Sequence, residues 1–390
     1  MSSIFTVHID VFFNLPLFRE AIKSIQDQTY QNMEIIISNN GADQEITDFI
    51  IETKKVDKRV KVLTYENNIF SYDDPLEYCD LLYNNALKIA EGKYHFRQSY
   101  DDIMALDYIE RMARLFDENT ECISAAGLPI RIDIEGRVRP REISERSKRS
   151  HNLRPRYMPG HEMALDCLNP EGGKMFSAPG TMFSFRKNAL IKYGGFHRST
   201  EWGQLFGIAP FGITGFDEEA IFYARSHSGQ LNKELYQRGW IGVKENSSMF
   251  NDLNIKERWS SSFGEDVARY ALSRMITLIY EPAAVCTVIC FFTFNFKGAV
   301  RAFFDSCWQL HYWKALPKAI WRHKMILVLS LLDTFQWVIQ PFINLLNSLL
   351  PSNAPGLGVI NKIQTHYDTG GISNEIMPEM MAKKEELHKQ

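Results

Sequence analysis

The first hundred residues alternate between short apolar runs and amphipathic runs, and this alternation constrains the fold more than any other feature of the chain. The apolar runs have the length of buried strands, and the amphipathic runs carry apolar side chains at helical spacing. Strands and helices that alternate in this way build βαβ units, so we predict an α/β fold with a mainly parallel sheet flanked by helices. The predicted strands are residues 4–13, 33–38, 59–66 and 93–99, and the predicted helices are residues 16–29, 43–55 and 77–92.

Polar residues follow two of these predicted strands. The segment "NNGA" (39–42) follows the second strand, and "YDD" (100–102) follows the fourth. Because ligands of parallel sheets bind beyond the carboxyl ends of the strands, we expect both segments to face one crevice. Asp101 and Asp102 have two explanations. Either one of them is the N-cap of a helix predicted over residues 103–116, or the pair holds a cation.

The second part of the chain is less regular. The pattern breaks over residues 130–175, where residues 137–156 form a loop rich in Arg and Lys that either binds phosphate or is a solvated surface. A strand followed by a helix is predicted again over residues 180–196. The segment "FDEEAIFYARSHSGQ" (216–230) is predicted to form an amphipathic helix. Three acidic residues open this predicted helix: Asp217, Glu218 and Glu219.

Charge and cysteine content exclude several classes of protein. The formal net charge of −3 provides no basic field, so we predict no nucleic-acid partner. The six cysteines are scattered and form no CxxC pair, which is typical of reduced thiols in a cytoplasmic protein. The opening "MSSIFTVHID" has no basic segment followed by an apolar one, so no signal peptide is predicted.

Residues 5 to about 250 resemble the family 2 glycosyltransferases of the GT-A fold. The resemblance rests on the order and spacing of "VFFN", "REAIKSIQDQTYQNMEIIISNNGA", "ENN", "YNNALKIAEGKY" and "YDD", and it returns at "APGTMFSFRKNALIKYGGF". It implies a GT-A (Rossmann-like) domain over residues 1–260. The chain departs from the family in two places. The family's DXD motif would put an acid at position 99 or 100, where this chain has Ser99 and Tyr100, and Asn39 stands where the family often has Asp.

This resemblance implies a nucleotide-sugar donor and a divalent cation. Mg²⁺ or Mn²⁺ neutralises the charge that develops on the leaving diphosphate. Asp101 is the implied metal ligand, with Asp102 beside it or on the sugar. Asn39 is expected at the base, since an amide matches the edge that uracil and thymine share, although it is equally a turn residue. Asn14 and Asn84 are expected to order the same pocket, or to be local caps.

Enzymes of this family generally invert the anomeric centre, which requires a base that deprotonates the acceptor hydroxyl. The resemblance implies that Asp217, Glu218 or Glu219 is this base. The alternative is that all three acids stabilise the dipole of the predicted helix.

The C-terminal region is predicted to be helical over residues 261–351, with a loosely ordered tail over residues 352–390. Trp alternates with Lys and Arg, and the polar residues between 325 and 350 lie on one helical face. Such helices bind the membrane interface, and the alternative is a helical bundle or a homo-oligomer interface. Membrane binding fits an enzyme on the inner face of the cytoplasmic membrane whose glycan acceptor is linked to polyprenyl diphosphate, in surface polysaccharide biosynthesis.

Two other functions remain open at this point. The reduced DXD motif is compatible with a catalytically inactive nucleotide-sugar-binding or scaffold protein. A nucleotidyltransferase has a similar α/β core, but the chain lacks the Gly-rich, basic N-terminal loop that such enzymes use.

Overall fold

The computed structural model describes most of the first three hundred residues and a few residues beyond them. Backbone contacts divide the chain into two compact units, Met1–His227 with Glu245–Arg274 and Ser228–Lys244 with Met275–Gln390. The described residues are 3–72, 74–138, 155–167, 183–197, 200–227, 235, 254–292, 296–304, 306–307, 312–314 and 316–317. Most of the predicted basic loop, the predicted helix over residues 325–350 and the predicted tail therefore lie outside the described residues.

The alternation predicted for the first hundred residues is confirmed. Asn14 accepts a hydrogen bond from the N–H of Leu17 and so begins the first helix, and Asp43 begins the second by accepting from the N–H of Ile46 at 2.9 Å. The elements are β1 (Phe5–Val11), α1 (Leu15–Gln26), β2 (Met33–Asn40), α2 (Gln44–Val56), β3 (Val60–Tyr65), α3 (Glu77–Ile89) and β4 (Tyr94–Gln98).

The first unit continues with shorter helices and longer strands. The strand and helix predicted over residues 180–196 are confirmed where they are described, while two helices near residues 160 and 200 were not predicted. The elements are β5 (Ile103–Met104), α4 (Tyr108–Glu118), β6 (Cys122–Ile132), β7 (Tyr157–Pro159), α6 (Gly160–Cys167), β8 (Phe183–Arg186), α7 (Lys187–Lys192), α8 (Thr200–Gly207), η2 (Ala209–Phe211), β9 (Ile213–Arg225) and α11 (Ile255–Phe263).

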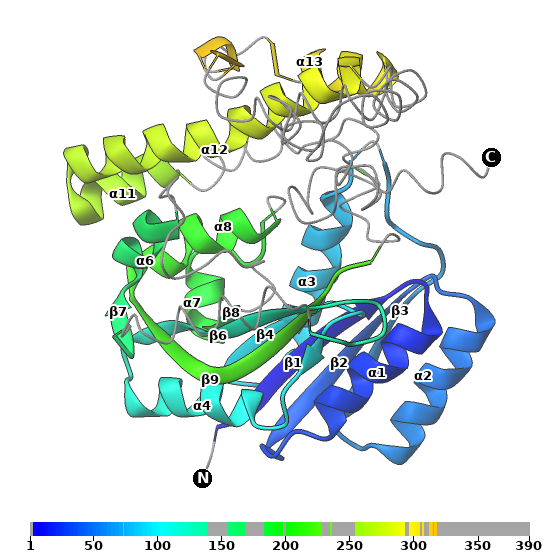
Figure 1. Ribbon diagram of the computed structural model, residues 1–390. Helices are drawn as coiled ribbons and strands as arrows, with labels where there is room; N and C mark the ends of the chain where they lie inside the picture. Colours follow the sequence, from blue (N-terminus) through cyan, green and yellow to red (C-terminus); the bar gives the residue numbers. More distant parts are fainter. Residues whose placement is uncertain are drawn as a thin grey trace, which may run out of the picture. The chain divides into compact units, whose positions relative to one another are not determined.

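Nine strands form one mixed sheet in the order β3-β2-β1-β4-β8-β6-β9-β5, and β7 pairs with β9 (Figure 1). β1, β2, β3 and β4 are parallel to one another. β6 is antiparallel to β8, which is antiparallel to β4, so β6 and its parallel neighbour β9 run in the same direction as β1. The predicted α/β fold with a mainly parallel sheet is therefore confirmed.

Two different layers cover the two faces of the sheet (Figure 1). On the face that α4 covers, Tyr94 stacks on Phe116 with ring centroids 4.6 Å apart, and Phe96 packs against Tyr108. Apolar burial on this face is the main stabilising contribution, at about 25 cal/mol for each Å² removed from water. On the opposite face, Tyr83 of α3 packs against His8 of β1, so α3 meets a more polar surface.

The layer beneath α3 contains a row of buried polar side chains. Thr6 donates a hydrogen bond to Glu34 at 2.6 Å, and His8 is hydrogen-bonded to Ser38 at 2.9 Å. Glu34 also forms a 2.7 Å ion pair with Lys61. Hydrogen bonds from Lys61 and Thr6 more than offset the effect of burial on Glu34 and lower its pKa. The polar row is thus hydrogen-bonded across β1, β2 and β3.

One predicted helix begins later than predicted, and another is wrong. Residues 103–104 form the short strand β5, and α4 begins only at Tyr108, so neither Asp101 nor Asp102 caps it. The segment predicted as a helix with Asp217, Glu218 and Glu219 at its start is the strand β9. Tertiary pairing explains this second difference, because β9 is hydrogen-bonded to β6 along most of its length. Its aromatic and branched side chains also suit a pleated surface.

The described part of the second unit is helical. α12 (Glu265–Phe292) begins in the first unit and ends in the second, and α13 (Phe296–Phe304) follows it. The helical character predicted from residue 261 onward is confirmed for these residues. No helix in the described ranges has the length and apolar content that crossing a bilayer requires.

Candidate active site

The carboxyl ends of β1 and β4, where the sequence predicts a ligand crevice, are neighbours in the sheet. The chain passes from β1 to β2 and β3 on one side and then returns to add β4 on the other side of β1. This is a topological switch point, where open α/β sheets bind their ligands. The segment after β1 meets the segment after β4 here, because the rings of Phe13 and Tyr100 lie 5.0 Å apart.

Asp101 and Asp102 lie in the turn after β4, and each is 6% exposed. Asp101 Oδ2 is 3.0 Å from His227 Nε2, and Asp102 Oδ1 accepts a 2.8 Å hydrogen bond from the N–H of Arg225. Burial and the neighbouring Asp101 raise the pKa of Asp102 well above its ordinary value. The two carboxyl groups are therefore held by the end of β9 and not by the helix that follows them.

The donor set at Asp101 fits a divalent cation that a bound diphosphate also coordinates. Its carboxylate and the His227 imidazole are ligands that Mn²⁺ accepts, and Mg²⁺ accepts the carboxylate. Among the described residues, no three acidic, imidazole or thiol groups converge as a metal site. A cation at Asp101 would therefore need phosphate oxygens and water for most of its coordination, which is how proteins usually hold Mg²⁺ beside a phosphorylated ligand.

Three residues of this site were not predicted from the sequence. His227 and Arg225 come from the end of β9 and contact Asp101, more than 120 residues earlier in the chain. Asp10 lies on β1, and burial raises its pKa to about 6, although the charge of Arg97 opposes this shift. The one signal in the sequence was the acidic Asp10 within the predicted buried strand. Nothing in the sequence indicated which strand would supply His227.

The structure gives Asn14 and Asn39 local partners. Asn14 is the N-cap of α1, with its backbone in the left-handed region at φ 68°. Asn39 is 3% exposed; its side-chain oxygen accepts from the N–H of Ala42, and its amide donates to Thr47, both at 3.0 Å. Each side chain thus orders a turn at the carboxyl edge of the sheet, the role that the turn and cap explanations predicted.

Asn84 joins α3 to the turn that precedes Phe196. Its amide donates to the carbonyl of Phe196 at 2.7 Å, and its side-chain oxygen accepts from the N–H of the same residue at 2.8 Å. The left-handed Gly195 allows this approach, because a Cβ there would lie 2.5 Å from the Asn84 oxygen. Asn84 therefore connects two motifs that are more than a hundred residues apart in the sequence.

The acidic triplet lies on an irregular part of β9. In the pairing with β6, Phe216 lies opposite Ala126 and Ile221 opposite Leu128, so the intervening residues of β9 form a bulge. The four residue steps of extended chain from Ile221 to Arg225 span roughly 13 Å. The structure therefore does not bring the triplet to the turn that Arg225 holds.

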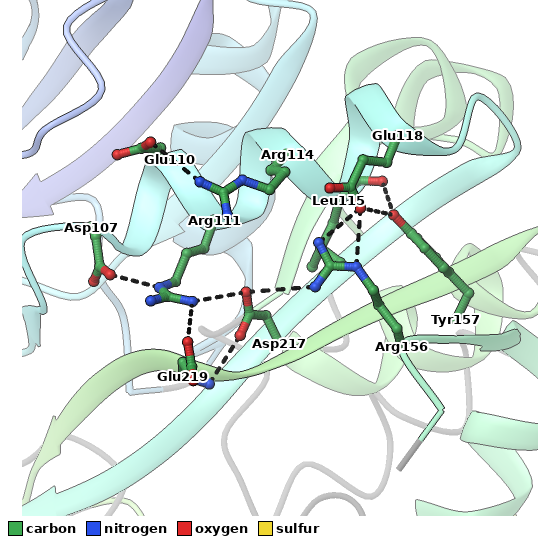
Figure 2. Close-up of polar contacts among 10 residues, drawn as sticks. All are labelled: Asp107, Glu110, Arg111, Arg114, Leu115, Glu118, Arg156, Tyr157, Asp217 and Glu219. Carbon is green, nitrogen blue, oxygen red and sulfur yellow. Dashed lines mark hydrogen bonds and ion pairs between the residues drawn. The ribbon is translucent and has the colours of Figure 1, made fainter.

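Two of these three acids are paired with arginine (Figure 2). Asp217 Oδ2 lies 3.3 Å from Arg111 Nη1 and 4.0 Å from Arg156 Nη1, and Glu219 Oε2 lies 2.8 Å from Arg111 Nη1. Glu218 is exposed and forms no hydrogen bond or ion pair with any other described residue. The pairs join β9 to α4 and to the segment before β7.

Comparison with known sequences identifies several relatives that are named glycosyltransferases. No family model matches the chain. An uncharacterized glycosyltransferase of Haemophilus influenzae is 34% identical over 116 residues, which are 30% of this chain and 33% of the relative. One of Rickettsia prowazekii is 25% identical over 305 residues, which are 73% of this chain and 85% of the relative.

The length of the match differs among these relatives. One of Rickettsia conorii is 26% identical over 236 residues, 59% of this chain and 35% of the relative. The chain thus spans about a third of the length of the Haemophilus influenzae and Rickettsia conorii proteins. Among solved structures, TarS of S. aureus aligns with a TM-score of 0.47 and 14% identity over 70% of this chain and 43% of that chain. At this TM-score the alignment does not establish a shared fold.

Proposed function

We propose that the chain is a glycosyltransferase of the GT-A, family 2 type that transfers one sugar from a nucleotide-sugar donor to a glycan acceptor. The observation that carries the proposal is the turn of Asp101 and Asp102 at the switch point of the sheet, with His227 beside it. The names of the sequence relatives support the same class of enzyme.

The side chains at this turn have distinct proposed roles. Asp101 and His227 would hold Mg²⁺ or Mn²⁺. The cation supplies neutralisation of the charge that develops on the leaving diphosphate. Asp102, which is held by the N–H of Arg225, lies next to this position and is proposed to contact the sugar or to orient Asp101. The burial of Asp101 keeps bulk water away from its carboxylate, which strengthens its interaction with a cation.

The base of the donor is proposed to be uracil, so UDP is the first nucleotide to test. The side chain of Asn39 is already hydrogen-bonded to Ala42 and Thr47, so only its remaining donor and lone pair can recognise the base. An amide has two donors and two lone pairs, and the turn engages one of each kind. The shared edge of uracil and thymine makes dTDP the second nucleotide to test.

An inverting transfer requires a base. The acidic triplet is its proposed source on the sequence resemblance alone, because the structure does not bring the triplet to the Asp101 turn. Of the three acids, Glu218 is the one that no ion pair engages in the described part of the chain. Asp217 and Glu219 are both ion-paired with Arg111, so their carboxylate oxygens already have a cationic partner. We therefore assign the base role to Glu218 before the other two. Its substitution Glu218→Gln should abolish transfer and leave UDP binding intact.

The test of the donor site is a calorimetric titration of UDP into the full chain, with Mn²⁺ and with EDTA. Wild type should bind UDP more tightly with Mn²⁺, and Asp101→Asn should weaken that binding at least about tenfold. Asp107→Asn is the matched control, since Asp107 is a nearby acid that pairs with Arg111 on α4. Equal affinity with Mn²⁺ and EDTA, for UDP and then for dTDP and GDP, would contradict the metal-dependent donor site.

The two alternative functions predict other results. A catalytically inactive nucleotide-sugar-binding or scaffold protein binds UDP but shows no Mn²⁺-dependent hydrolysis of UDP-sugars. A nucleotidyltransferase releases diphosphate from a nucleoside triphosphate, which a family 2 enzyme does not. Both assays use the same purified chain, so they separate the three classes directly.

The second unit is proposed to bind the cytoplasmic leaflet, where a polyprenyl-diphosphate-linked acceptor of surface polysaccharide synthesis would be found. On and just after α13, large apolar side chains are about half exposed: Val300 at 53%, Phe304 at 52% and Trp313 at 49%. Lys297 and Lys314 are exposed in the same segments. Apolar side chains flanked by cations are typical of surfaces that insert into anionic membranes.

A further inference from the structure

Arg225 has the most extensive hydrogen bonding of the side chains around the candidate site. Its side chain is fully buried, with 0% exposure. Its Nε donates to the carbonyl of Asp101 at 2.8 Å, and its main-chain N–H donates to Asp102 at 2.8 Å. One residue thus holds both the backbone and a carboxylate of the turn at Asp101.

The rest of the guanidinium reaches two other segments. Its Nη1 donates to the carbonyls of Ile134 at 2.6 Å and Asp133 at 3.4 Å, just beyond β6. Its Nη2 donates to Glu20 of α1 at 2.5 Å. Because the guanidinium is planar with donors in fixed directions, these contacts fix the turn relative to β6 and α1.

The buried positive charge of Arg225 is stable only because these contacts surround it. A buried cation without partners is strongly unfavourable, so carbonyl and carboxylate oxygens must surround it. Lysine retains the charge but has a single nitrogen, which cannot satisfy directions as different as those toward Asp101, Ile134 and Glu20. Substitution by lysine therefore tests geometry at constant charge.

We propose that Arg225 is a positioning residue that orients the Asp101–Asp102 turn so that the Asp101 carboxylate faces the donor crevice. The expected effect of Arg225 on nucleotide binding rests on the proposed function. Its positioning of the turn does not, and it can be measured without any ligand. Arg225 acts through Asp101 and Asp102 and is not proposed to touch the donor. His227, two residues later, contacts Asp101 from the same end of β9.

The experiment compares Arg225→Lys with Arg186→Lys. Arg186 is the matched control, because its guanidinium also bonds several backbone carbonyls, those of Phe116, Asn119 and Cys122, at the end of α4. Two quantities are measured for each variant of the full chain. The first is amide hydrogen exchange in peptides over residues 99–105 and 116–123. The second is the affinity of UDP with Mn²⁺.

In Arg225→Lys, exchange over residues 99–105 should rise and UDP should bind about tenfold more weakly. In Arg186→Lys, exchange should rise over residues 116–123, with UDP affinity unchanged. Unchanged exchange over residues 99–105 in Arg225→Lys would overturn the inference. So would a loss of thermal stability in both variants with equal effects on UDP affinity. If wild type binds no nucleotide, the proposed function fails, and the exchange data still decide whether Arg225 positions the turn.

Glu20→Gln provides a milder variant if Arg225→Lys does not fold. Glu20 is 51% exposed, so its substitution removes a charge partner of Arg225 without opening the core. It should raise amide hydrogen exchange over residues 99–105 and weaken UDP binding about threefold. Both changes have the same direction as those expected for Arg225→Lys. The effects of the two substitutions should be less than additive, since both act through one guanidinium. No change in exchange or in affinity would also overturn the inference.

Discussion

His95 is fully buried beneath α3, and neither of its ring nitrogens has a hydrogen-bond partner among the described residues. Its ring packs against Phe196, with centroids 5.5 Å apart, and lies 6.3 Å from the ring of His8. Burial lowers the pKa of His95 to about 3, against the charge of Glu34, which raises it, while the charges of Lys187 and Arg97 act in the same direction as burial. His95 is therefore neutral in the folded protein at every physiological pH.

Because the pKa of His95 is lowered in the folded protein, the free energy of unfolding falls at acidic pH. Below pH 6.5 the unfolded chain binds a proton at His95 that the folded chain does not bind until about pH 3. Each pH unit in that window costs about 1.4 kcal/mol for one such histidine, so wild type loses about 2 kcal/mol at pH 5 on this account. Urea denaturation of His95→Phe should show a smaller loss between pH 7.5 and pH 5 than wild type.

Other groups titrate in the same window, and the comparison of the two proteins removes their effect. The pKa of Asp10 is raised to about 6, so its folded state gains a proton first and its contribution to stability rises as the pH falls. The pKa of His8 is lowered by burial and acts in the same direction as His95. Both groups are present in wild type and in His95→Phe. Identical pH dependence in the two proteins would show that His95 does not titrate in this way.

For single residues, the sequence predicted their position at the edge of the sheet better than it predicted their hydrogen-bond partners. Asp101 and Asp102 follow a buried parallel strand, and strand ends of this kind converge on one edge whatever their partners are. Their contacts with Arg225 and His227 depend on a strand that pairs far from them in the sequence. Asn39 and Asn84 have partners within the protein, and a side-chain amide forms equally good hydrogen bonds with a base, a turn or a neighbouring loop. Local sequence does not decide among these.

At the scale of elements, β9 shows where periodicity fails. Three acids before an aromatic run suit the start of a helix, and no Gly or Pro interrupts residues 216–227. Pairing with β6 overrides this preference, and the extra residues are absorbed by a bulge at the acids themselves. The helices and strands before residue 100 were predictable because their apolar faces repeat regularly and each is bounded by a cap or a turn.

The bridge between α3 and the turn at Phe196 gives a prediction on how two elements are held together. Asn84→Ala removes both hydrogen bonds to Phe196 and leaves its buried N–H and carbonyl unpaired. The free energy of unfolding should fall by about 1–3 kcal/mol in urea denaturation. Asn85→Ala is the control, since Asn85 lies on the same helix as Asn84 and makes a longer 3.2 Å hydrogen bond with Tyr65 of β3. Its effect should stay within about 0.5 kcal/mol.

The same pair of variants tests the earlier assignment of Asn84 to the nucleotide site. If Asn84→Ala keeps its stability but no longer binds UDP, the side chain serves the ligand and not the bridge. If stability falls and UDP still binds, the bridge is its role.

At the scale of the whole molecule, the surface on and after α13 predicts binding to anionic membranes. The full chain should sediment with vesicles rich in phosphatidylglycerol and much less with vesicles of phosphatidylcholine alone. Replacing Phe304 and Trp313 by Ser should weaken this binding at least about tenfold, because each large side chain contributes 1.5–3 kcal/mol when it leaves water, as a rough range.

The first unit offers a control for nonspecific hydrophobic binding to vesicles. Val56 at the end of α2 is 71% exposed, and Val56→Ser removes an exposed apolar side chain that lies far from α13 in the sequence. Its vesicle binding should equal that of wild type. Equal sedimentation with both lipids, or an equal loss in both variants, would favour a protein partner or a homo-oligomer interface for the second unit.

The late position of β9 in the chain has a consequence for synthesis on the ribosome. The segments up to β4 can pair with one another as soon as they emerge, since each contacts neighbours that precede it. Asp101, however, meets His227 only after another 126 residues have been added. Contacts of such long sequence separation form slowly. A growing chain therefore passes through a stage in which about half of the sheet is built while Asp101 and Asp102 still lack their partners from the end of β9, and the proposed donor site forms only when β9 is in place.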